Sequence, residues 1–164
     1  MKTIKLACLD TQILIWGIRK EATGNQTKMI EKAEVFLQQL STNYSAVLLP
    51  SIVIAEFLVK IPYSNHPQTI SAFSKKFRIA HFDLKVASQY AKIWRERPQI
   101  ETTKDPFISK RDIKADCMII ATALAHEAEV IYSHDDGLKK MAAGKIEVRQ
   151  MITDTLLDYV SETS

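Results

Sequence analysis

The chain has 164 residues, of which 46% are hydrophobic and 25% are charged. This balance is typical of a folded globular protein and excludes an intrinsically disordered or low-complexity chain. The length suits one domain, which we expect over residues 1–164 with a core over about 4–148. The net charge of +3 favours a polyanionic partner only mildly and does not decide the function.

The sequence also bears on location and on the role of the cysteines. The longest apolar stretches, such as Ser45–Ile54, are too short to span a bilayer, so we expect no contact with a membrane. The basic N-terminus lacks a small-residue cleavage site, and we therefore expect a cytoplasmic protein. Cys8 and Cys117 lie among apolar residues without CxxC spacing, which predicts buried free thiols.

Short apolar runs rich in β-branched residues predict the strands. They cover residues 4–9, 46–49, 78–82, 130–132 and 146–148. The runs are nearly continuous rather than alternating, which is typical of a parallel sheet that is buried on both faces.

Helical periodicity separates these strands. It predicts helices over residues 27–40, 52–60, 84–96, 115–128 and 153–160. We expect Ser51 to cap the second helix, and we interpret Arg97–Asp112 as a long irregular connection. Strands that alternate with helices predict an α/β fold, a three-layer α/β/α sandwich with a mostly parallel central sheet.

Acidic residues occur where such a fold places its chemistry, at the carboxyl ends of the strands. Asp10 ends the first predicted strand, Asp135 follows the fourth, and Glu56 lies in the helix after the second. Asp116 opens the long apolar helix and reaches the same edge only if the preceding loop crosses to that side. Clustered carboxylates repel one another, and a hard divalent cation with oxygen ligands offsets that cost.

Each acid also has an ordinary structural interpretation. Asp10 is a candidate cap for the next helix, and Asp116 is a candidate first-turn acid. Glu56 could occupy a solvated stripe of its helix, and Asp135 begins an Asp-Asp-Gly turn sequence. Taken singly, these positions therefore leave both interpretations open.

Together the positions resemble a known family. The segments 9–14, 54–58, 114–123 and 130–135 look like the conserved blocks of the PIN domain, in that family's order. Within the superfamily the chain most resembles the VapC-type toxins of bacterial and archaeal toxin–antitoxin pairs. The resemblance implies a metal-dependent endoribonuclease that cleaves RNA with Mg²⁺ or Mn²⁺, an antitoxin as partner, and a homodimer.

The family's metal-binding and catalytic acids carry over to Asp10, Glu56, Asp116 and Asp135. We expect Asp10 and Asp116 to be inner ligands, with Glu56 and Asp135 acting through water or holding a second ion. Thr11 and Ser133 match positions where the family has hydroxyl groups near the site. Ser133 aligns Asp135 with the fourth acid of the family, and Asp136 is the less favoured alternative.

The sequence leaves two further interpretations open. Lys104, Lys110, Arg111 and Lys114 precede Asp116 and are candidates for RNA binding, although solvated loop charges explain them nearly as well. The rival function is a PIN-fold protein that binds RNA or a partner without cleaving. We favour the nuclease, because a binding module has no reason to keep four costly carboxylates together.

Overall fold

The computed structural model of the protein describes residues 5–97 and 110–151. Two sequence-based predictions lie outside these ranges: the helix over 153–160 and the candidate RNA-binding residue Lys104. The connection expected over 97–112 is described only at its two ends.

A parallel sheet of five strands forms the centre of the fold, in the order β3-β2-β1-β4-β5. The strands are β1 (Leu6–Leu9), β2 (Ala46–Pro50), β3 (Arg78–Ala80), β4 (Val130–Tyr132) and β5 (Glu147–Arg149). Every residue of β1 and β4 is buried, whereas the edge strands β3 and β5 are partly exposed. The continuous apolar runs thus predicted the buried central strands correctly.

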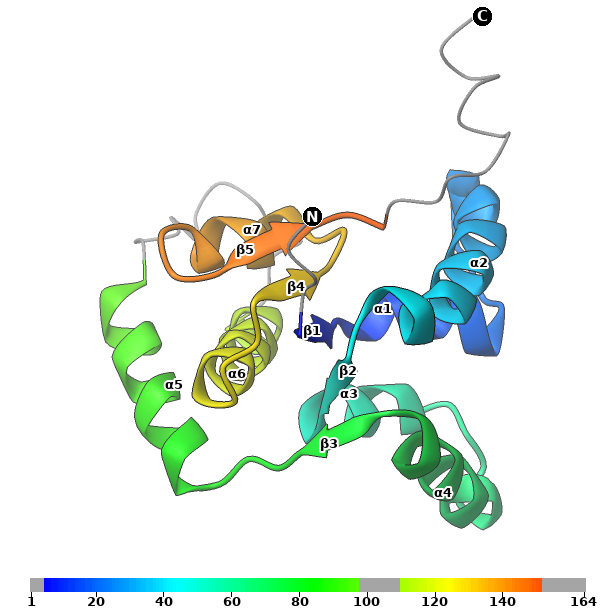
Figure 1. Cartoon of the computed structure of the whole chain (residues 1–164), viewed down its shortest axis with the longest axis horizontal. Helices are drawn as coiled ribbons and strands as arrows, with labels where there is room; N and C mark the ends of the chain where they lie inside the picture. Colours follow the sequence, from blue (N-terminus) through cyan, green and yellow to red (C-terminus); the bar gives the residue numbers. More distant parts are fainter. Residues whose placement is uncertain (1–4, 98–109, 152–164) are drawn as a thin grey trace, which may run out of the picture.

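Helices cover both faces of the sheet, which makes the predicted three-layer sandwich. The helices are α1 (Thr11–Leu14), α2 (Thr27–Asn43), α3 (Ser51–Leu58), α4 (His66–Lys76), α5 (Leu84–Glu96), α6 (Lys110–Ala125) and α7 (Asp136–Ala142). A π-helical turn, Ile15–Arg19, continues α1, and 3₁₀ turns Gly24–Gln26 and Tyr63–Asn65 precede α2 and α4. Figure 1 shows α5 and α6 on one side of the sheet and α2 and α4 on the other.

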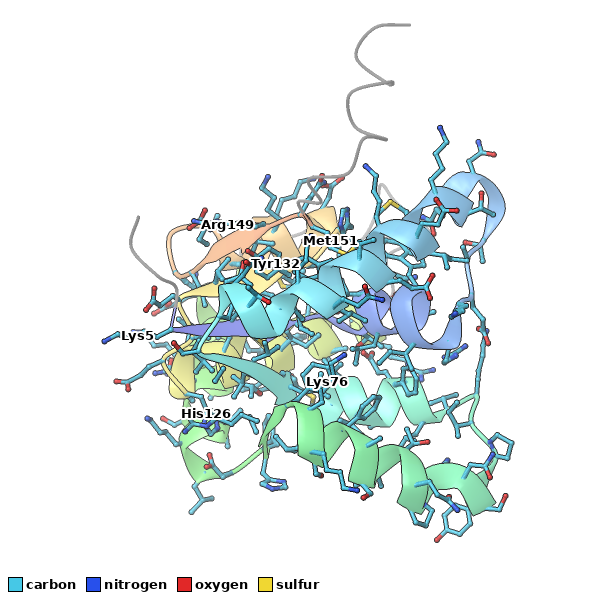
Figure 2. All side chains as sticks on the ribbon, turned by 45° about the vertical axis from the view of Figure 1, so that its right-hand side comes forward. Lys5, Lys76, His126, Tyr132, Arg149 and Met151 are labelled. Atoms are coloured by element: carbon cyan, nitrogen blue, oxygen red, sulfur yellow. The ribbon has the colours of Figure 1, made fainter. Side chains whose placement is uncertain are left out.

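Register brings the ends of two strands together. Leu9 on β1 pairs with Tyr132 on β4, and the amide of Asp10 donates to the Tyr132 carbonyl at 3.1 Å. The residues that follow β1 and β4 therefore lie side by side at the carboxyl edge. Figure 2 shows Lys5 and His126 at the opposite edge, where β1 and β4 begin.

Two predicted helix starts are wrong. Ser51 is the first residue of α3, and Pro50 occupies the cap position with no side-chain hydrogen bond. The Pro50 ring fixes φ near the observed −61°, so the chain leaves the strand and enters the helix at this residue. Helix α6 begins at Lys110 rather than at Ala115, and it ends at Ala125, before Glu127 adopts a left-handed φ of 60°.

The remaining differences concern elements without a clear sequence signal. Helix α4 lies in a segment for which the sequence predicted no element, and α7 begins within the Asp-Asp-Gly segment that suggested a turn. The thiols of Cys8 and Cys117 are buried and free, as predicted. Within the described ranges, no helix combines the length and apolar character needed to cross a membrane.

Candidate functional site

One hollow at the carboxyl edge contains all four predicted acids. Its volume is about 460 Å³, and its walls include Asp10, Glu56, Asp116 and Asp135. These residues come from the end of β1, from α3, from α6 and from the start of α7. The structure therefore brings Asp116 to the same edge as the other three, which the sequence left conditional on the path of the preceding loop.

Asp10 is the most buried of these acids, with 8% of its surface exposed. Its carboxylate accepts hydrogen bonds from the Thr11 amide and from the Ser133 hydroxyl, both at 2.6 Å. It also caps α1, so the structural interpretation of Asp10 is correct and coexists with its place in the hollow. A buried carboxylate needs such donors because it has lost most of its hydration.

Thr11 connects Asp10 to Glu56. Its backbone amide donates to Asp10, and its side-chain hydroxyl donates to a carboxylate oxygen of Glu56. Thr11 is itself buried, at 7% exposure, which fixes the hydroxyl between α1 and α3. The side chain of Glu56 is thus held toward the site rather than free on a solvated stripe.

Ser133 performs the corresponding task between β1 and α7. Its hydroxyl donates to Asp10 and accepts from the Asp135 amide at 3.0 Å. Asp135 caps α7, and its Oδ1 accepts from the Leu138 amide at 2.9 Å. Asp136 lies in the first turn of α7 and is not among the residues that line the hollow, whereas Asp135 is.

Asp116 lies in the second turn of α6, where it faces the other acids. Burial, followed by the charges of Asp135, Asp10 and Glu56, raises its pKa to about 8. Burial is also the largest cause of the raised pKa of Asp10, about 6, which the Ser133 and Thr11 hydrogen bonds partly offset. Mutual repulsion among carboxylates is the condition that a bound cation relieves.

The acids around the hollow offer carboxylate oxygens, and hard divalent cations prefer oxygen ligands. The side chains present therefore fit such a cation. In the described parts of the chain, however, no three His, Cys, Asp or Glu side chains already converge into a metal-binding group. Like charges keep such oxygens apart, and the Glu56 carboxylate is turned to the Thr11 hydroxyl. A cation held by three of these acids would need their carboxylates to come closer together.

A glycine leaves room for those movements. A Cβ on Gly137 would lie 3.0 Å from Asp135 Oδ1 and 3.8 Å from Asp116 Oδ2. Because Gly137 has no side chain, no methyl group occupies the space between these two acids.

Sequence reasoning missed a fifth acid in the hollow. Asp112 lies one helical turn before Asp116 on α6, lines the same hollow, and contributes to the raised pKa of Asp116. The four-residue spacing was an available signal, but the late predicted start of the helix concealed it. Other polar or aromatic wall residues carried no motif that pointed to the site: Gln12, Trp16, Gln26 and His134.

Three of the four candidate RNA-binding residues, all except Lys104, lie on the first turns of α6. Lys110, Arg111 and Lys114 are exposed and line a groove of about 460 Å³ between α3 and α6. Apolar residues, among them Ile52 and Met118, also line this groove. The groove reaches the acidic hollow, because Glu56 and Ala115 line both.

Known proteins give an independent comparison. A family model described as the PIN domain matches residues 7–144. Among solved structures, the chain is similar to VapBC2 from Rickettsia felis bound to a DNA fragment from its promoter, with a TM-score of 0.60 and 17% identity over 90% of this chain and 99% of that one. The chain is also similar to a toxin–antitoxin complex from Klebsiella pneumoniae, with a TM-score of 0.58 and 21% identity over 89% of this chain and 98% of that one.

VapBC-1 from nontypeable Haemophilus influenzae is similar to the same degree, with a TM-score of 0.58 and 20% identity over 89% of this chain and 98% of that one. The search of curated protein sequences found no match. At these identities the solved structures establish the fold, whereas the family model spans most of the chain. The protein belongs to the PIN domain family.

Proposed function

We propose that the protein is an endoribonuclease that uses Mg²⁺ or Mn²⁺ to hydrolyse RNA phosphodiester bonds. The observation that carries the proposal is the meeting of Asp10, Glu56, Asp116 and Asp135 in one hollow at the carboxyl edge of the sheet. Burial and mutual repulsion make this arrangement costly for the folded protein without a cation. A bound divalent ion would offset this cost, because its positive charge would stabilise the clustered carboxylates.

In this proposal Asp10 and Asp116 bind the ion directly, and Glu56 and Asp135 bind it through water or hold a second ion. A bound ion supplies positive charge that activates a water molecule and offsets the charge that develops on the phosphate. In hydrolysis a water oxygen would form the new bond to phosphorus while the bond from phosphorus to the leaving oxygen breaks, and the proton lost by the water would pass to the leaving oxygen.

The hydroxyl groups prepare the acids for this role. Ser133 donates to Asp10, and this hydrogen bond lowers the Asp10 pKa against the effect of burial. Thr11 donates to Glu56 and so holds its carboxylate near the hollow. Ser133 thus favours the ionised form of Asp10, and each hydroxyl group orients the acid to which it donates.

We further propose that the protein acts as the toxin of a toxin–antitoxin pair. Support comes from the similar solved structures, one of which is a toxin–antitoxin complex from Klebsiella pneumoniae and two of which are VapBC proteins. The proposal includes an antitoxin protein as partner, a homodimer, and a cytoplasmic location. A short reading frame directly upstream of the gene, whose product copurifies with this chain, is the expected finding; a gene without such a neighbour contradicts the toxin role but leaves the nuclease in place.

The experiment is RNA cleavage by the purified protein in Mg²⁺, in Mn²⁺ and in excess chelator, with Asp10→Asn in parallel. The proposal predicts cleavage that requires metal and disappears in the variant. Cleavage that persists in chelator, or equally in Asp10→Asn, contradicts the four-acid site. If the protein binds RNA but neither binds metal nor cleaves, the non-catalytic binding function replaces the nuclease.

A further inference from the structure

A second hollow adjoins the acidic one and has a different chemical character. Its volume is about 940 Å³, and it shares Gln12, Ile15, Gln26, Glu56 and Asp112 with the acidic hollow. Beyond this shared wall it is lined by the basic residues Arg19, Lys20, Lys60 and Arg111. A polyanion whose reacting phosphate lies among the acids would meet these cations with a neighbouring phosphate.

Arg19 is an unusual member of this set because it is buried. Only 7% of its side chain is exposed, and its guanidinium lies over the Phe57 ring at 5.6 Å. Its Nε is buried and has no hydrogen-bond partner among the described residues. A buried arginine with an unused donor is costly, so it calls for an explanation beyond surface charge.

The local backbone places an acid beside Arg19. The π-helical turn ends at Arg19, Lys20 adopts a left-handed φ of 56°, and the Glu21 amide then donates back to the Ile15 carbonyl at 3.3 Å. This reversal brings the Glu21 carboxylate to the Arg19 guanidinium, which donates to it. Single π turns inside or beside helices occur frequently at functional sites.

Glu21 also pairs with Lys60, whose Nζ lies 3.7 Å from the same carboxylate oxygen. One carboxylate thus pairs with the cations of two segments, the π turn and the turn that follows α3. The Arg19 hydrogen bond lowers the pKa of Glu21 and so keeps it anionic. An anion between two cations, on a wall of the hollow next to the acids, marks a place suited to an anionic ligand.

We propose that Arg19 and Lys60 form a phosphate subsite for the RNA strand and that Glu21 occupies this subsite until a phosphate of the RNA displaces it. The inference rests on the proposed function, because it concerns the substrate of the same site. Glu21 is half-exposed, at 49%, and can swing away into solvent. The subsite therefore positions the strand beside the acids, and Glu21 weakens binding by competition.

The test is the binding of a labelled single-stranded RNA of mixed sequence in excess chelator, followed by fluorescence anisotropy at several salt concentrations. Glu21→Gln removes the competing anion and should tighten RNA binding several-fold. Lys60→Gln should weaken it up to about tenfold and reduce the salt slope by about one. Arg19→Gln should act likewise, while Lys60, at 69% exposure, tests the subsite without disturbing a buried contact.

A matched control is available on β5. Glu147 pairs with Arg149 at the same two-residue spacing, is exposed to a similar degree, and lines neither hollow. Glu147→Gln changes the net charge equally and should leave RNA affinity nearly unchanged. Equal effects of Glu21→Gln and Glu147→Gln would reduce the inference to bulk charge and overturn it.

Two other outcomes separate this inference from the proposed function. If wild type cleaves RNA with metal but Glu21→Gln and Lys60→Gln bind RNA as wild type does, the subsite is wrong and the nuclease stands. If the variants alter binding of a poly-glutamate peptide and not of RNA, the hollow takes an acidic polypeptide and the RNA subsite is wrong. Absence of metal-dependent cleavage is a failure of the proposed function and is measured separately.

Discussion

The hydroxyl of Ser133 donates to Asp10 Oδ2 at 2.6 Å and joins the ends of β1 and β4 across 123 residues of sequence. Because Ser133 also accepts from the Asp135 amide, one buried side chain orients two of the acids. Asp10 in turn accepts from Thr11, which donates to Glu56. The candidate site is thus a connected network of hydrogen bonds at the edge of the sheet.

Removal of the Ser133 hydroxyl should disturb both stability and the site. Ser133→Ala leaves the buried Asp10 without one donor, which should cost about 1.5–3 kcal/mol of the free energy of unfolding. Because that hydrogen bond lowers the Asp10 pKa, its loss should move the pH dependence of activity to higher pH. Ser133→Thr retains the hydroxyl and should restore most of the stability and most of the wild-type pH dependence. Urea unfolding measures the first, and pH–rate profiles measure the second.

The pH dependence of stability without metal follows from Asp10 and Asp116. Their folded-state pKa values, about 6 and about 8, exceed the ordinary value, so the folded state keeps protons that the unfolded state has released. Their contribution to the free energy of unfolding should therefore fall as pH rises from about 4 to about 8. This loss of stability with rising pH should be smaller in Asp116→Asn than in wild type. Melting temperatures in chelator that fall equally with pH in both proteins would contradict the prediction.

The sequence predicted much of the fold and the position of three of the acids at the carboxyl edge of the sheet, because both depend on local signals. Continuous apolar runs identify the buried strands β1 and β4, and the acids at their ends follow from chain order. The position of Asp116 depended on how the chain returns from α5 to α6, which periodicity cannot reveal. Only the tertiary structure shows that α6 directs this acid into the hollow.

Other features were hidden because one sequence pattern serves two structures. Asp135-Asp136-Gly137 suits a turn, but Asp135 here caps a helix, and the two interpretations share the same residues. The Arg19–Glu21 contact depends on a π turn and on a left-handed Lys20, neither of which has a sequence signature. Asp112 was missed only because α6 starts earlier than its apolar pattern.

The register of the fourth acid can be tested by neighbouring substitutions. Asp135 lines the hollow, whereas Asp136 is not among its wall residues. Asp135→Asn keeps an N-cap oxygen for α7 and should preserve the fold while it strongly reduces RNA cleavage. Asp136→Asn should cleave at close to the wild-type rate, and the opposite ranking would shift the register by one residue.

Gly137 should matter more for metal binding than for folding. Gly137→Ala places a methyl group 3.0 Å from Asp135 Oδ1, so that carboxylate must move. Alanine otherwise favours a helix over glycine by about 0.5–1 kcal/mol, which offsets the crowding in overall stability. We expect weaker Mg²⁺ binding by calorimetry with a nearly unchanged melting temperature in chelator, and unchanged Mg²⁺ affinity would argue against a role for this space.

We propose that the acids around Asp116 hold a divalent ion, and the melting temperature at about pH 8 as Mg²⁺ is added tests this most directly. Wild type should become more stable as the ion binds the folded state. Asp116→Asn should begin with a higher melting temperature in chelator, because one repulsive charge is absent, and should gain little from Mg²⁺. Asp136→Asn is the matched control and should respond like wild type. Equal Mg²⁺ responses in wild type and Asp116→Asn would contradict the metal site.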